Sequence, residues 1–239
     1  MKKQTCFSIV LVALLVGGKI ARAEMPTSKV YGDTLDRQTQ TAYVRADVGW
    51  ATYESGAVSN NATGVANTFE VGGAAGTSRT LAISFQSSQA DIPFSVKSTS
   101  VSMSFNDVKL RYRIGYLYPT VAGTMTRVKI SEDKIAQHDV FGSGGGGGLG
   151  VKMPITKEIM FEGEGLVFKT VESHDKMGGT TRMGDRMEGS GVVAFDLTPD
   201  LVDFMIGHRY RRYTMRIDER DTDEVQSSPF VGLRLGVYF

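Results

Sequence analysis

The sequence predicts an all-β protein, an antiparallel β-barrel that crosses a membrane with ten strands or, as the alternative, eight. Three observations predict it. The chain begins with an export signal, and after it no apolar run approaches the roughly 20 residues that a transmembrane helix needs. Segments of about ten residues instead alternate between apolar and polar side chains, with polar or glycine-rich breaks between them. A strand of about that length, apolar on one side only, is what a membrane-spanning barrel requires.

Residues 1–23 have the three parts of a secretory signal peptide. Lys2 and Lys3 give a positive start, residues 7–16 are apolar apart from one serine, and Ala21-Arg22-Ala23 offers small residues on both sides of a cleavage position. We therefore expect export and cleavage near Ala23.

Composition narrows the function classes. The signal takes four of the 27 basic residues and none of the 26 acidic ones, which leaves 23 against 26, a net charge of about −3. This balance gives no reason to expect a nucleic-acid partner. Cys6, the single cysteine, leaves with the signal. Disulfides and cysteine-based zinc sites are thereby excluded, and the mature chain suits an oxidising compartment.

The last segment, 230–239, shows the clearest alternation. One face carries Val231, Leu233, Leu235, Val237 and Phe239, and the other carries Gly232, Arg234, Gly236 and Tyr238. A closing strand of this kind with a terminal Phe resembles the C-terminal signal of Gram-negative outer-membrane β-barrel proteins, and the pattern is most similar to the small barrels of the OmpA-transmembrane and OmpX type.

This resemblance implies several properties. They are a multi-pass protein of the outer membrane, contact with outer-membrane lipid and lipopolysaccharide, and assembly by machinery that reads Val237, Tyr238 and Phe239. In such barrels both chain ends lie on the periplasmic side, with short turns there and longer loops outside.

Working backwards from the C-terminus gives a topology. Residues 24–40 are a polar periplasmic tail and residues 41–239 are the barrel. The expected strands are 42–53, 67–74, 79–88, 107–118, 123–131, 139–153, 158–172, 185–197, 201–216 and 228–239. Long external loops fall at 89–106, 172–184 and 217–227, and a periplasmic turn falls at 119–122. In the eight-stranded alternative, part of 54–106 is loop.

Charged residues fall mostly on one face of these strands. A Lys or Arg facing lipid at mid-bilayer costs about 2–4 kcal/mol, so the charged face should line the lumen. The predicted lumenal charges are Arg45, Asp47, Lys109, Arg111, Arg113, Arg127, Lys152, Glu162, Glu164, Glu188, Asp196, Asp203, Arg209, Arg211 and Arg234. Isolated buried charges are costly, which favours a structural salt-bridge network over a pore lining. A narrow water path remains the alternative in a ten-stranded barrel.

Aromatic residues near the strand ends predict interfacial girdles. They are Trp50, Tyr53, Tyr116, Tyr118, Tyr238 and Phe239. The glycine run at 142–150 lacks the Lys and the following helix of a phosphate-binding loop. We interpret it as a strand whose glycines allow bending or let neighbouring bulky side chains cover it.

No motif predicts a cofactor or a metal. His138 and His174 are placed in external loops beside Asp139 and Asp175, which imitates a hydrolase site, but neighbouring strand residues face opposite ways. The acidic segment 218–224 lacks the glycine and glutamate positions of an EF-hand loop.

The function favoured by the sequence is a non-enzymatic, monomeric outer-membrane protein that acts in envelope structure or in surface interaction through its external loops. A small channel for ions or solutes is the first alternative, and an outer-membrane hydrolase is the second.

Overall fold

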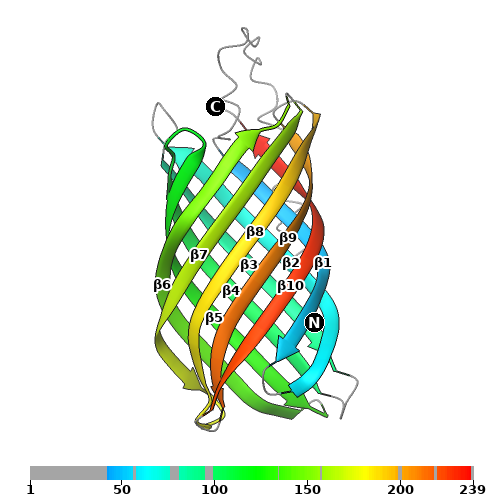
Figure 1. Ribbon diagram of the computed structural model, residues 1–239, viewed down its shortest axis with the longest axis vertical. Coiled ribbons are helices and arrows are strands. Elements are labelled where there is room, and N and C mark those ends of the chain that lie inside the picture. The colour runs from blue at the N-terminus through cyan, green and yellow to red at the C-terminus, as the bar shows by residue number, and fades with distance from the viewer. Residues whose placement is uncertain are drawn as a thin grey trace. The chain divides into compact units, whose positions relative to one another are not determined.

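The computed structural model describes residues 42–55, 58–75, 81–94, 99–133, 135–156, 158–198, 201–217 and 220–237, and these form a closed antiparallel β-barrel (Figure 1). The ten-stranded prediction is confirmed. The predicted signal, the periplasmic tail, Tyr238 and Phe239 lie outside the described residues. The strands are β1 (Ala42–Ser55), β2 (Val58–Ala75), β3 (Leu81–Pro93), β4 (Ser100–Tyr112), β5 (Leu117–Glu132), β6 (Ile135–Pro154), β7 (Ile159–Asp175), β8 (Arg182–Thr198), β9 (Val202–Ile217) and β10 (Arg220–Val237).

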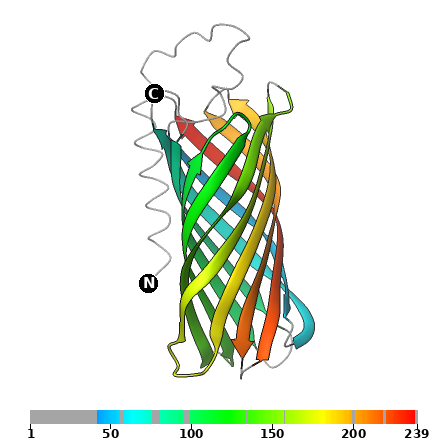
Figure 2. The ribbon, with the colours of Figure 1, turned by 60° about the vertical axis from the view of Figure 1, so that its left-hand side comes forward.

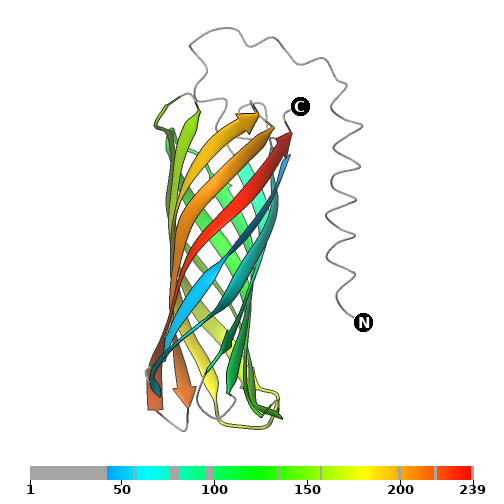
Figure 3. The same cartoon turned by 90° about the vertical axis from the view of Figure 1, so that its right-hand side faces the viewer.

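Each strand pairs with the next along the chain, and β1 pairs with β10 to close the barrel. Val48 lies opposite Val231, and Figure 3 shows β10 (red) running beside β1 (blue). The strands β5 to β8 form the green-to-yellow wall in Figure 2. We call the end that holds Ala42 and Val237 the periplasmic end, following the orientation of outer-membrane barrels, and the opposite end the outer end.

Lipid-facing character is confined to one part of the outer wall. β4 illustrates the pattern, since its outward residues near the periplasmic end are Val108, Leu110 and Tyr112. The exposed apolar side chains of this band on all ten strands include Val48, Trp50, Val65, Val71, Leu81, Ile83, Phe85, Leu117, Val121, Met125, Leu149, Met153, Val167, Met187, Leu197, Ile206, Val231 and Leu233. An apolar exterior on a closed antiparallel barrel is the arrangement of a transmembrane barrel of the outer-membrane type. No helix among the described residues is long and apolar enough to cross a membrane.

The strands continue beyond this band toward the outer end. They are 13 to 20 residues long, whereas a bilayer needs about 9–11. On β4 the outward residues of the extension are Ser100, Ser102, Ser104 and Asn106, and the inward ones between them are apolar. The barrel wall therefore has a lipid-facing part with apolar residues outside and an outer part with polar residues outside.

The long external loops predicted from the sequence are wrong. The segment 217–227 belongs to β9 and β10, and only 218–219 separates these strands. The reason is cross-strand charge pairing, because Arg216 binds Asp221 and Arg212 binds Asp223 on the outward face. The predicted loops 89–106 and 172–184 likewise shrink to 94–99 and 176–181, because β3, β4, β7 and β8 extend into them.

The periplasmic turn predicted at 119–122 is also displaced. The chain turns at Gly115 and Tyr116, where Gly115 has a φ of 62° that favours glycine, and Pro119 lies within β5. Backbone hydrogen bonds between Ile114 and Leu117 close the turn. As a result Tyr118 faces the lumen instead of the interface. Tyr53, also predicted for a girdle, points inward and is buried, whereas Trp50 is 63% exposed on the outer face.

The glycine run lies in β6 and pairs with β5 and β7. Its inward glycines approach the neighbouring backbone so closely that a Cβ at Gly146 would overlap the carbonyl oxygen of Val167. At Gly150 a Cβ would overlap the ring of Tyr118, which covers this glycine from the adjacent strand. Of the two roles predicted for the run, covering by a bulky neighbouring side chain is seen at Gly150.

Candidate functional site in the lumen

The lipid-facing part of the barrel holds a dense set of charged side chains in its lumen, which we call the inner network. The predicted residues that point into it are Arg45, Asp47, Lys109, Arg111, Lys152, Glu162, Glu164, Glu188, Asp196, Asp203, Arg209, Arg211 and Arg234. Strand parity places them together, because each strand presents alternate residues to the same side.

One predicted member, Arg127, lies elsewhere. Arg127 is on the outward face of β5, where it binds Asp139 with a side chain that is 49% exposed. Its charge predicts a lumenal position, but the outward residues of β5 become polar beyond the apolar band, and Arg127 shares the parity of the outward Val121 and Met125. Arg113 follows the last residue of β4 and lines the lumenal cavity at its periplasmic end, where its Nε donates to the carbonyl oxygen of Gly115.

Three charged members were missed: Glu70, Asp107 and Arg186 are buried in the lumen. The sequence pattern that places each of them on the inward face was present. Asp107 and Arg186 share the parity of Lys109 and Glu188, and Glu70 falls within the expected strand 67–74. Applying the alternation to every residue of the expected strands 67–74, 107–118 and 185–197 finds all three.

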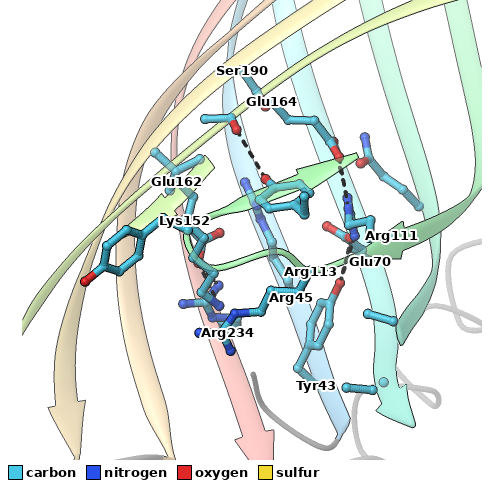
Figure 4. Close-up of a pocket in the computed structure, with 18 of the residues that line it drawn as sticks. Tyr43, Arg45, Glu70, Arg111, Arg113, Lys152, Glu162, Glu164, Ser190 and Arg234 are labelled. Carbon is cyan, nitrogen blue, oxygen red and sulfur yellow. Dashed lines mark hydrogen bonds and ion pairs between the residues drawn. The ribbon is translucent and has the colours of Figure 1, made fainter. Parts of the chain in front are cut away.

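Glu164 organises the first part of the network, near the periplasmic end (Figure 4). Its carboxylate accepts hydrogen bonds from Lys109 Nζ at 2.8 Å and from Arg111 Nε at 2.9 Å. Arg111 extends the cluster through Nη1, which donates to Glu70 at 3.2 Å and to Ser84 at 2.9 Å. Two buried cations therefore depend on one carboxylate, with Glu70 as a second partner for Arg111.

Glu162 organises a second part, contributed by β6, β7, β9 and β10. It lies between Lys152, whose Nζ is 3.2 Å away, and Arg234, which donates to it through Nη1. Arg234 also donates from Nε to Asp203 at 2.7 Å. Asp196 lies opposite Asp203 in the pairing of β8 with β9. The strands on this side of the barrel are thus joined across the lumen.

Asp47 and Glu188 anchor two further arginine clusters. Asp47 Oδ2 forms ion pairs with Arg45 Nη2 at 3.2 Å and with Arg209 Nη2 at 3.3 Å. Glu188 receives Arg211 Nε at 2.8 Å, and the same guanidinium donates to Ser88. Charges that would be costly alone in the lumen are in this way neutralised by nearby partners, on the same strand for Arg45 and on other strands for Arg209 and Arg211.

Aromatic rings complete the environment of Arg186. Its Nη2 donates to Asp107 at 2.8 Å, whereas its buried Nε and Nη1 have no hydrogen-bond partner. The guanidinium lies 3.9 Å from the ring centroid of Phe168 and 5.1 Å from that of Phe105. These cation–π contacts stabilise the charge where hydrogen bonds are missing.

A cavity of about 130 Å³ opens from the inner network toward the periplasmic end. Figure 4 shows Arg45, Arg111, Lys152 and Arg234 pointing into it together with Glu162 and Glu164. Because each of these cations is held by a carboxylate, the cavity wall is polar but internally paired.

The lumen is closed beyond the network by an apolar cluster, which we call the outer core. Its members are Ala51, Tyr53, Ala62, Ala66, Ala90, Ile92, Val101, Met103, Phe105, Val128, Val140, Met183, Tyr213 and Met215. Phe105, Tyr213 and Met215 each expose 1% or less of their surface. Side chains this inaccessible border no space that a water molecule can enter, so among the described residues the lumen is filled at this level.

His138 does not form the hydrolase arrangement considered from the sequence. The His138 ring contacts Asp175, at 2.9 Å from Nδ1, rather than the adjacent Asp139. The Thr181 hydroxyl meets the same nitrogen at 3.1 Å. A catalytic triad places its nucleophile and its carboxylate on opposite ring nitrogens. Asp175 also accepts the Met177 amide, so this cluster fastens the β7–β8 connection. Among the described residues no group of three His, Cys, Asp or Glu side chains is placed to hold a metal ion.

Neither protein-family models nor curated protein sequences match this chain. Several solved structures are similar at low identity. Neisserial surface protein A has 12% identity and a TM-score of 0.43, over 83% of this chain and 98% of that one. The outer-membrane protease OmpT of Escherichia coli has 7% identity and a TM-score of 0.47, over 81% and 96%. Ail, the attachment invasion locus protein of Yersinia pestis, has 12% identity and a TM-score of 0.35, over 81% and 99%. TM-scores below 0.5 do not identify a function for this chain.

Proposed function

We propose that this chain is a non-enzymatic integral protein of the outer membrane with a closed lumen, and that it acts in envelope structure and surface contact rather than in the passage of solutes. The observation that carries the proposal is the outer core, in which Phe105, Tyr213 and Met215 are fully buried across the lumen. An ion entering from the periplasmic cavity would have to leave water and cross this apolar layer, which is the kind of constriction that blocks conduction.

The inner network supports the same proposal. Its cations and anions bind each other across strands, so they brace the wall of the barrel. A pore lining would instead present charges to water. Surface contact then falls to the extended outer wall, because the outer connections between described strands are short.

Single-channel conductance of the refolded protein in a planar lipid bilayer tests the proposal. We expect no discrete conductance steps from protein whose folding is verified by different gel mobility before and after boiling. The double variant Phe105→Gly with Tyr213→Gly, which removes two of the three aromatic rings of the outer core, should conduct if it folds.

Steps from the parent protein whose size falls in Arg111→Gln would overturn the proposal and favour a channel. The hydrolase alternative has a separate test, because it predicts an activity that His138→Ala abolishes while the barrel stays folded. We expect no hydrolysis of peptide or glycolipid ester bonds by the parent protein.

A further inference from the structure

A groove lies on the outward face of the barrel wall where β3, β4 and β5 leave the apolar band. It has a volume of about 250 Å³, and we call it the wall groove. Its outward lining residues are Gln89, Asp91, Ser102, Ser104, Arg127 and Lys129. Strand register arranges them in two adjacent rows, Gln89–Ser104–Arg127 and Asp91–Ser102–Lys129.

The groove is hollow because its middle strand carries short side chains. Ser102 and Ser104 form the floor on β4, and longer side chains rise from β3 on one side and β5 on the other. The two edges differ in chemistry. Gln89 and Asp91 supply amide and carboxylate groups, and Arg127 and Lys129 supply cations.

An apolar field adjoins the groove on the same three strands, toward the periplasmic end. Ile83 and Phe85 on β3, Val108 and Leu110 on β4, and Val121 on β5 expose between 42% and 67% of their surface. Only Ser87, Asn106 and Met125 separate this field from the groove. A molecule with acyl chains on the field would therefore place its headgroup in the groove.

The charges fit a phosphorylated headgroup. Arg127 donates from Nε and Nη2 to Asp139, at 2.7 and 2.6 Å, which fixes the guanidinium and leaves Nη1 outside the pair. Lys129 lies one row further out on the same strand, so both cations lie along one edge. On the opposite edge, Asp91 and Gln89 can accept and donate hydrogen bonds to sugar hydroxyl groups.

We propose that the wall groove binds the phosphorylated sugar headgroup of a glycolipid from the surrounding outer leaflet, with phosphate at Arg127 and Lys129 and sugar hydroxyl groups at Gln89, Asp91 and the two serines. This site goes beyond the closed-lumen function. It depends on the outward wall alone, so the glycolipid and conductance experiments can fail independently.

Binding is tested by native mass spectrometry of the detergent-solubilised, folded protein, with a diphosphorylated hexa-acyl glucosamine disaccharide as the probe. We expect a stoichiometric adduct with the parent protein. Because both cations attract the phosphate, Arg127→Gln with Lys129→Gln should weaken binding at least tenfold. The dephosphorylated disaccharide should bind the parent protein as weakly.

The matched control is Arg212→Gln with Arg216→Gln. It removes two outward cations of β9 that also bind carboxylates, and it should leave binding unchanged. A second variant, Ser102→Val with Ser104→Val, fills the floor without changing charge and should weaken binding too.

Three results would overturn the proposal. The first is that both groove variants bind the disaccharide as tightly as the parent protein does. The second is that the β9 control loses as much affinity as the groove variants. The third is that the parent protein binds phosphatidylglycerol as tightly as the disaccharide, which would mean that phosphate alone is recognised. Gel mobility before and after boiling identifies any variant that fails to fold, and the remaining groove variant then decides.

Discussion

The two halves of the lumen are filled in opposite ways. The inner network, surrounded by the lipid-facing wall, consists of ion pairs such as Glu164 with Lys109 and Arg111. The outer core, surrounded by a polar wall, consists of apolar side chains such as Phe105 and Met215. The outer half is thus built like a water-soluble barrel with an ordinary core, and the lipid-facing half is built inside out.

A single strand shows the change. On β4, Val101, Met103 and Phe105 point inward while the serines between them point outward. After Asp107 the inward residues are Lys109 and Arg111, and the outward ones are apolar. Strand parity is kept and the polarity of the two faces is exchanged, because the medium outside the wall changes from water to lipid. The two fillings should therefore respond differently to the same kind of substitution.

Truncation of a buried side chain at the border of the two halves should cause the largest loss of unfolding free energy. Phe105→Ala removes a buried ring that packs in the outer core and lies 4.5 Å from the guanidinium of Arg211. Loss of a buried Phe side chain to Ala costs about 3–5 kcal/mol of unfolding free energy, and we expect about 4. Urea unfolding in lipid vesicles, followed by the fluorescence of Trp50, measures it. A loss near zero would mean that the ring fills no space that the fold needs.

A substitution that keeps shape and removes charge should be nearly as costly in the inner network. Glu164→Gln leaves Lys109 without a carboxylate and Arg111 with Glu70 alone. Breaking a buried pair costs about 3–5 kcal/mol, and we expect about 3 because Glu70 remains. The same unfolding assay measures it.

The double variant Glu164→Gln with Lys109→Met tests the cause. It removes the stranded ammonium and should recover part of the lost stability. If the double variant is less stable than Glu164→Gln by the full cost of a second buried change, charge imbalance is not the reason.

In the outer core, a substitution that keeps the size of the side chain should cause only a small loss of unfolding free energy. Met215→Leu keeps an apolar side chain of similar volume at a site with 0% exposure, and such exchanges usually cost less than about 1.5 kcal/mol. The contrast with Glu164→Gln is the sharpest form of the comparison. Equal losses of unfolding free energy in the two variants would show that the halves do not differ in this way.

The exchange of polarity also explains which parts of the fold the sequence predicts. In the lipid-facing part the alternation of apolar and charged residues fixes the face of each residue, so Arg45, Glu164 and Arg234 are placed correctly from parity alone. The inward position of Glu70 follows from the same rule, because Glu70 alternates with Phe69 and Val71 within the expected strand 67–74.

Beyond the apolar band the apolar residues point inward instead of outward, so the sequence-based prediction of strand ends and residue faces fails there. In β4 the apolar residues change from odd to even numbers at Asn106 and Asp107, which interrupts the alternation and makes 89–106 resemble a loop in the sequence. In β5 the same shift turns Arg127 outward. A search for strands that continue through a one-residue phase shift would have found both. The pairing of His138 with Asp175 depends on a contact between β6 and β7 that spacing along the chain does not encode.

Breaking an ion pair outside the lumen should have the smallest effect on the free energy of unfolding. Arg212 and Asp223 face water on the outer wall, and each side chain is 51% exposed. Exposed pairs are screened by salt and add little to stability, so we expect Arg212→Gln to leave the urea midpoint unchanged within error. Buried pairs of the inner network, such as Arg186 with Asp107, are screened much less. Raising the salt concentration should therefore abolish any residual effect of Arg212→Gln and leave the loss in Glu164→Gln intact. A salt-sensitive loss in Glu164→Gln would mean that water reaches the inner network, and the closed lumen would then have to be abandoned.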